Sequence, residues 1–138
     1  GKIITTTCGD YPKGIYRIPT GGIKHNEDIM KALFREVKEE LGLEVKVRAF
    51  GGAVRIRFEY DDDYLMFYSY LFILDEIGGK LLLDASDNEI SEIREVDLEG
   101  LSKTAGALGA IKGKWRDWGH FRYITTNAVY QYLKKQCI

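Results

Sequence analysis

The chain of 138 residues contains 45% hydrophobic and 30% charged residues and carries a formal net charge of −1, values typical of a single globular domain. This charge balance excludes a broad attraction to nucleic acid or to anionic membranes, so any anion must bind at a local patch. No apolar run approaches the roughly 18 residues of a membrane span, and no basic and apolar leader opens the chain. We therefore expect one cytoplasmic domain over residues 1–138.

The N-terminal part of the chain predicts two short strands followed by a helix. Residues 2–7 are rich in β-branched side chains, and residues 15–18 form a second strand before a proline. After a glycine turn, apolar spacing indicates a helix that begins at Asn26 or Glu27 and that Gly42 ends as a C-terminal cap.

The remainder of the chain predicts a hairpin, one more strand and a terminal helix. Three aspartates join two alternating segments and are typical of the turn of a long hairpin. The expected elements are strands at 44–50, 53–60, 64–75 and 92–98, a short helix at 97–105, an irregular loop at 103–119 and a helix at 121–135. This order indicates an α/β fold in which a mixed β-sheet lies between helices, an α/β/α sandwich.

The predicted helix carries the crowded glutamates Glu36, Glu39 and Glu40. Like charges three or four residues apart repel by roughly 0.2–0.5 kcal/mol per pair, so the cluster needs open solvent or a counter-charge. On a wheel of about 100° per residue, Glu40 falls inside the edge of the apolar face and Glu36 borders it. The apolar face consists of Ile29, Met30, Leu33, Phe34, Val37 and Leu41. Carboxylates withdrawn from water in this way take up protons or bind cations, whereas the plainer alternative is a solvated acidic face.

The residues before the helix favour cation binding. Gly21 is followed after five residues by Glu27 and after seven more by the string REVKEELGL at 35–43. This pattern resembles the Nudix box at every fixed position, and the surrounding strands, hairpin and terminal helix resemble the Nudix arrangement. The resemblance implies a Nudix-like α/β/α sandwich whose first strand is absent or lies upstream of Gly1. It also implies hydrolysis of a nucleoside diphosphate linked to another moiety X, with Mg²⁺ or Mn²⁺ as cofactor.

The resemblance assigns roles to the charged residues of the helix. Glu36, Glu39 and Glu40 match the carboxylates that bind the metal and act in catalysis, and Arg35 matches the arginine that orients them. Metals of this kind bridge a diphosphate and lower the pKa of a bound water.

Further positions match the parts of the box that support the site. Gly21, Glu27 and Gly42 match its fixed structural positions. The backbone carbonyl of Thr20 matches a metal ligand of some members, although a glycine is common where this threonine stands.

The general base and the residues that hold the substrate lie outside the box. The candidate bases are Glu89 and Glu92, and Glu89 is favoured because it lies in the loop, whereas Glu92 falls at the start of the predicted strand. The plainer alternative for each is an ordinary surface glutamate. Arg55 and Arg57 share one face of a strand and are candidate phosphate ligands, unless they pair with acidic neighbours across the strands. Tyr60 stands near the position of a tyrosine that marks dinucleoside polyphosphate hydrolases of the family.

Three further points concern the tryptophans, the partners and the alternatives to an enzyme. Trp115 and Trp118 either stack on a base or pin their loop onto the core. The expected partner is a nucleotide-type small molecule, and the resemblance is also compatible with a homodimer. The alternatives to an enzyme are a Nudix-like sensor that binds a nucleotide without turnover and an interaction domain with a solvated acidic helix.

Overall fold

The computed structural model describes residues 1–82 and 90–136. In chain order its elements are β1 (Ile3–Thr7), α1 (Ile29–Leu41), β2 (Leu43–Tyr60), β3 (Asp63–Gly79), β4 (Glu92–Val96), α2 (Leu98–Gly109), the 3-10 turn η1 (Gly113–Trp115) and α3 (Arg116–Gln136). The expected α/β class is confirmed. Within the described ranges, no helix is both long enough and apolar enough to cross a membrane.

Among the described residues the strands form two antiparallel pairs, β1 with β4 and β2 with β3, and not the mixed sheet between helices that the sequence predicted. The expected strand at 15–18 is reduced to one bridge, in which Arg17 exchanges backbone hydrogen bonds with Thr6. The ladder ends there because the next hydrogen-bonding position is Pro19, which has no N–H to donate.

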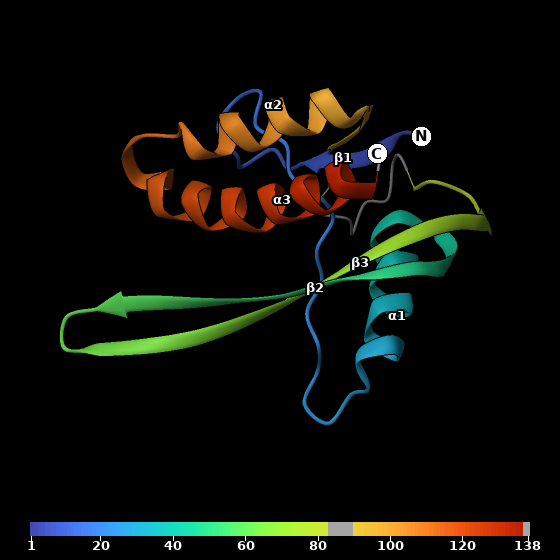
Figure 1. Ribbon diagram of the computed structural model, residues 1–138, viewed down its shortest axis with the longest axis horizontal. Coiled ribbons are helices and arrows are strands. Elements are labelled where there is room, and N and C mark those ends of the chain that lie inside the picture. The colour runs from blue at the N-terminus through green and yellow to red at the C-terminus, as the bar shows by residue number, and fades with distance from the viewer. Residues whose placement is uncertain (83–89, 137–138) are drawn as a thin grey trace.

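The β2–β3 hairpin is the longest feature of the fold and projects beyond the helices (Figure 1). Its turn places Tyr60 opposite Asp63, as expected. The predicted break at Gly51 and Gly52 is wrong, because β2 continues through it with a register shift between Phe50 and Gly52. Gly52 has φ +119°, so the glycines serve a bulge and not a strand end.

The segment expected to be an irregular loop, 103–119, is mostly helical and includes the end of α2 and the start of α3. Its glycines allow the two helices to approach closely. A Cβ on Gly119 would stand 2.5 Å from the carbonyl oxygen of Leu108. The predicted loop is wrong because glycines usually indicate the end of a helix, whereas here they allow the helices to pack closely.

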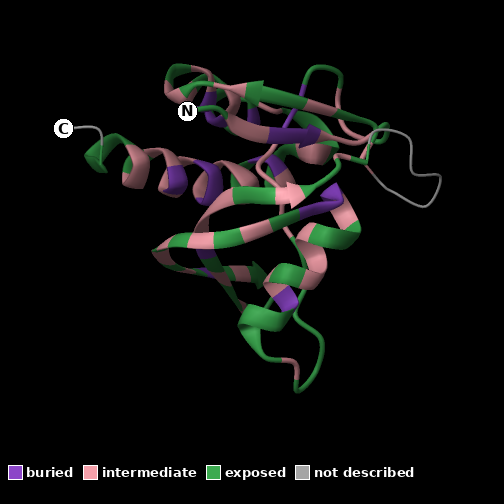
Figure 2. Cartoon of the chain, turned by 90° about the vertical axis from the view of Figure 1, so that its right-hand side faces the viewer, coloured by how far each residue is buried: buried purple, intermediate pink, exposed green. Residues whose placement is uncertain are grey.

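The core lies where the hairpin meets α2 and α3, around Leu71, Leu101 and Val129. Figure 2 shows buried positions in these helices and strands and mainly exposed positions at the far end of α1. α1 lies on the other side of the hairpin from α2 and α3 (Figure 1). Its N-terminal end projects past the hairpin, which leaves three residues of the predicted apolar face exposed: Ile29, Met30 and Phe34.

Candidate functional site

Both ends of α1 are fixed by caps. Asp28 accepts a hydrogen bond from the backbone N–H of Lys31 at 3.1 Å, so the helix begins at Ile29, slightly later than predicted. Gly42 ends the helix, as expected, in the left-handed conformation with φ 75°. A Cβ on Gly42 would stand 2.3 Å from the carbonyl oxygen of Lys80. The left-handed conformation at position 42 and its close contact with Lys80 therefore both require glycine.

The guanidinium of Arg35 is the centre of the site. Its Nε and Nη2 each donate to one oxygen of Glu27 at 2.8 Å. Its Nη1 donates to Glu36 at 2.8 Å and to Glu39 at 3.1 Å, and its Nη2 also donates to the carbonyl oxygen of Gly22 at 3.1 Å. One side chain thus joins three carboxylates of the helix and the loop before it, residues 20–28, which we call the box loop.

Glu27 is held as a carboxylate by these contacts. Its hydrogen bonds from Arg35, and then that from the backbone N–H of Lys24, lower its pKa to about 2. The hydrogen bonds to Glu27 and Glu36 raise the pKa of Arg35 in turn. The box loop is therefore tied to α1 through charged groups that keep their charge across the ordinary pH range.

Gly21 allows the box loop to lie directly on the helix. A Cβ at this position would stand 2.3 Å from Cγ and 2.6 Å from Cβ of Glu36, closer than nonbonded carbon atoms approach. The neighbouring Gly22 has open space at the same point. Glycine is thus required at this fixed position of the box because a larger side chain would clash with Glu36, a candidate metal ligand.

Glu39 is more exposed than Glu36 and Glu40, as the helical wheel predicted. The side chain of Glu36 is 20% exposed and that of Glu39 is 58% exposed, while Glu40 is half-buried. The repulsion among them is offset in part by Arg35, which contacts two of the three. The counter-charge that the sequence required is therefore present within the same helix.

The donor chemistry of this site fits a hard divalent cation, since carboxylate oxygens are the ligands that Mg²⁺ and Mn²⁺ prefer. Glu36 and Glu39 each use one oxygen for Arg35, and each has a second oxygen. In the described part of the chain, no three His, Cys, Asp or Glu side chains already converge as a complete metal site. A cation here would accordingly draw on backbone oxygens, water or substrate phosphates as further ligands.

Thr20 is joined to a residue that sequence reasoning missed. Arg17 donates from Nη1 to the hydroxyl of Thr20 and from Nε to the hydroxyl of Tyr11 at 2.7 Å. The backbone of Arg17 is fixed by its bridge to β1. Nothing in the spacing of the box identifies this contact, because Tyr11 belongs to the turn region before it.

The candidate substrate ligands lie on the projecting hairpin. Arg55 and Arg57 are exposed on the same face of β2, and Tyr60 is exposed at the hairpin turn. Arg57 pairs with Glu59 at 3.0 Å and stacks on Tyr64, with 4.1 Å from its guanidinium carbon to the ring centroid. No described hydrogen bond or ion pair joins these three residues to α1. Their predicted role in substrate binding is therefore neither supported nor contradicted by these contacts.

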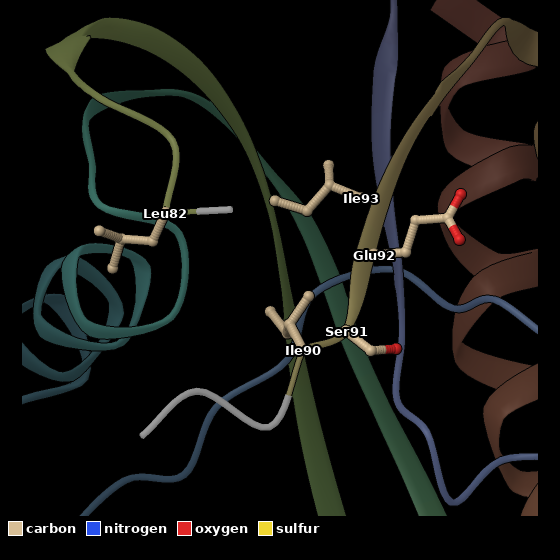
Figure 3. A pocket seen from close by; sticks show the side chains of 5 residues that line it. All are labelled: Leu82, Ile90, Ser91, Glu92 and Ile93. Carbon is tan, nitrogen blue, oxygen red and sulfur yellow. The ribbon is translucent and has the colours of Figure 1, made fainter. Parts of the chain in front are cut away.

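The candidate base Glu89 lies outside the described residues, so its role stays a prediction. Its alternative, Glu92, begins β4 beside a small pocket lined by Leu82, Ile90, Ser91, Glu92 and Ile93. Figure 3 shows the carboxylate of Glu92 on the opposite side of the strand from Ile93. Burial, followed by a hydrogen bond with Glu92, raises the pKa of Tyr16. Glu92 is thus engaged with Tyr16.

The fold and the site define a known class of domain. The profile of the NUDIX domain family matches residues 4–118, and the chain therefore belongs to this family. It is 33% identical over 93 residues to the ADP-ribose pyrophosphatase of Methanocaldococcus jannaschii, a match that covers 67% of this chain and 52% of that protein. It is 32% identical over 81 residues to Nudix hydrolase 8 of Arabidopsis thaliana, covering 56% of this chain and 21% of that protein. The chain thus spans only part of the length of both relatives.

Proposed function

We propose that this chain hydrolyses a nucleoside diphosphate linked to another moiety X. Water attacks a phosphorus of the diphosphate, and the products are a nucleoside monophosphate and phosphorylated X. The observation that carries the proposal is the contact of Arg35 with Glu27, Glu36 and Glu39, because it organises the charged residues of an intact Nudix box around one point.

We propose Glu36, Glu39, Glu40 and the carbonyl of Thr20 as the ligands of Mg²⁺ or Mn²⁺. A bound divalent ion supplies charge neutralisation of the diphosphate and a lowered pKa of the attacking water. Arg35 holds two of the carboxylates in position. Glu89 is the proposed acceptor of the proton from that water.

The substrate proposal begins with ADP-ribose, because a relative bears the name ADP-ribose pyrophosphatase. Arg55, Arg57 and Tyr60 are the proposed substrate ligands on the hairpin. A cytoplasmic location and a homodimer also belong to the proposal. Cell fractionation tests the location, and size-exclusion chromatography with light scattering tests the dimer.

The deciding experiment is a substrate panel of nucleoside triphosphates, nucleotide sugars, ADP-ribose and dinucleoside polyphosphates with Mg²⁺ or Mn²⁺. We expect release of a nucleoside monophosphate that falls by on the order of 10³-fold in Glu39→Gln and Glu40→Gln, since ion stabilisation of the transition state is worth several kcal/mol. Glu44→Gln, an exposed position on β2, is the matched control. Binding of ADP-ribose without cleavage, with metal present, would instead establish the non-catalytic sensor.

A further inference from the structure

A second cluster of side chains lies beside the box loop and has no role in the proposed hydrolysis. Its aromatic part consists of Tyr11, Trp115 and Trp118. The ring centroids of Tyr11 and Trp118 are 4.7 Å apart, and those of the two tryptophans are 5.2 Å apart. Arg17 joins the cluster to the box loop, since it donates to both Tyr11 and Thr20.

Arg122 follows Trp118 by one turn of α3, so both residues lie on the same stripe of the helix. Its guanidinium stacks on Phe121, with 4.5 Å from the guanidinium carbon to the ring centroid. Its Nε is shielded from solvent and has no hydrogen-bond partner among the described residues, and the hydroxyl of Thr126, one helical turn further on, is in the same condition. Buried polar atoms in native proteins almost always have partners. Two unpaired polar atoms on the same stripe of α3 therefore mark a place suited to a polar ligand.

The charges of the cluster have the same sign. Burial, and then the nearby positive charge of Arg17, lower the pKa of Arg122 to about 10. Among the described residues, no ion pair joins either Arg17 or Arg122 to a carboxylate. Packing of the tryptophans on Tyr11 explains the aromatic contacts, but it does not explain two arginines for which the described residues supply no ion pair.

We propose that Arg17 and Arg122 form an anion subsite that binds a phosphate group of the substrate, with Tyr11 and Trp118 as its aromatic wall. Guanidinium forks match phosphate oxygens in geometry and charge. An anion here would satisfy the buried Nε and relieve the repulsion between the two arginines. The inference rests on the proposed function, because the contact of Arg17 with Thr20 sets the subsite next to the diphosphate-cleaving loop.

The bound phosphate can belong either to the nucleoside monophosphate half or to the phosphorylated X half of the substrate, so the test includes a compound that represents each half. The chain contains only two tryptophans, and both belong to the cluster, so intrinsic fluorescence reports on it directly. The full chain is titrated in EDTA with inorganic phosphate, AMP, ribose 5-phosphate and adenosine. Equilibrium dialysis of labelled phosphate measures the same binding by a method that does not depend on tryptophan fluorescence.

We expect saturable binding of the phosphate compounds that weakens by about ten-fold or more in Arg122→Met, because hydrogen bonds to charged groups are lost. The ligand that binds tighter, AMP or ribose 5-phosphate, identifies the half of the substrate that the subsite holds. Arg116→Met is the matched control, since Arg116 lies in the same segment but is exposed and paired with Asp117 at 3.5 Å. If Arg122→Met does not fold, Arg17→Met provides the second test.

Equal phosphate binding in wild type and both arginine variants would overturn the subsite, and so would an adenosine curve that matches that of AMP. These outcomes are separable from failure of the proposed function. A chain that cleaves no substrate but binds phosphate through Arg122 retains the subsite. A chain in which Arg122→Met cleaves substrate with an unchanged KM retains the function and loses the subsite.

Discussion

Arg35 on α1 and Arg122 on α3 are both half-buried, and their surroundings are opposite in charge. Arg35 contacts three carboxylates and a carbonyl oxygen of the box loop. Arg122 stacks on Phe121, the positive charge of Arg17 contributes to its lowered pKa, and its buried Nε has no hydrogen-bond partner among the described residues. The first guanidinium has its donors occupied by the protein itself, so its role is to organise the site.

The second guanidinium differs because its charge is not balanced by the described residues around it. A half-buried cation beside a like charge destabilises the fold unless an anion relieves the repulsion. The pair of environments therefore separates two uses of arginine in one domain: Arg35 positions protein carboxylates, and Arg122 is suited to a ligand phosphate. Four variants test where this distinction holds.

The largest effect is expected for Arg35→Met. Loss of the guanidinium leaves Glu27, Glu36 and Glu39 without their common partner, and changes of this kind weaken metal sites by roughly 10- to 100-fold. We expect kcat/KM to fall by a similar factor and part of it to return at high Mg²⁺ concentration. Activity measured across a metal titration checks this. The control is Arg94→Met, which removes an arginine stacked on Tyr16 at 4.0 Å. Equal effects in both variants would contradict the proposal that Arg35 organises the site.

The second variant, Gly21→Ala, tests the close contact between the box loop and α1 without changing any charged residue. Gly21→Ala places a methyl group against Glu36, whereas Gly22→Ala meets nothing within 4 Å. Displacement of the loop by a fraction of an ångström should lower kcat/KM on the order of ten-fold for Gly21→Ala, with little change for Gly22→Ala. Steady-state kinetics of both variants at saturating metal test the difference. Similar activities would show that close contact between loop and helix is not needed.

The sequence predicts the Arg35 region well because its contacts are local. Glu27, Arg35 and Glu39 lie close to one another along the chain, so the resemblance to the box, which is a local pattern, assigns Arg35 its role beside the two glutamates. Gly42 ends the helix as predicted, whereas the cap at Asp28 starts it slightly later than predicted. The short sequence pattern of the box therefore corresponds to a set of contacts within one local region of the fold.

The Arg122 region was missed for the converse reason. Tyr11, Arg17 and Trp118 come from separate parts of the chain, and no short pattern links them. The glycines near Trp118 predict a loop, and this prediction hides the helical spacing that puts Trp118 and Arg122 on one stripe of α3. Contacts across the fold depend on how the helices pack, and packing distances such as that at Gly119 are not encoded in a local motif.

The third variant, Glu27→Gln, tests the charge balance of the Arg35 region through pH. The pKa of Glu27 is lowered from 4.5 to about 2 in the folded chain, so its carboxylate stabilises the fold above pH 4.5 and loses this effect as the pH falls toward 2. Wild type should be more stable than Glu27→Gln at pH 7, and the difference should vanish near pH 2. Urea unfolding at several pH values measures it. Glu99→Gln, at an exposed pair on α2, is the control, and a difference for Glu27→Gln that does not change with pH would contradict the assignment.

The smallest effect is expected for Arg57→Ala, which extends the comparison to an exposed arginine on the hairpin. Its side chain is 55% exposed and paired with Glu59, so solvent weakens any contact with substrate phosphate. If Arg57 binds substrate, KM should rise by about two- to five-fold with kcat unchanged, the scale of exposed ion pairs. Arg48→Ala is the control, because Arg48 lies on the same strand and pairs with Asp75. A KM equal to that of wild type would remove Arg57 from the residues that bind the substrate phosphates.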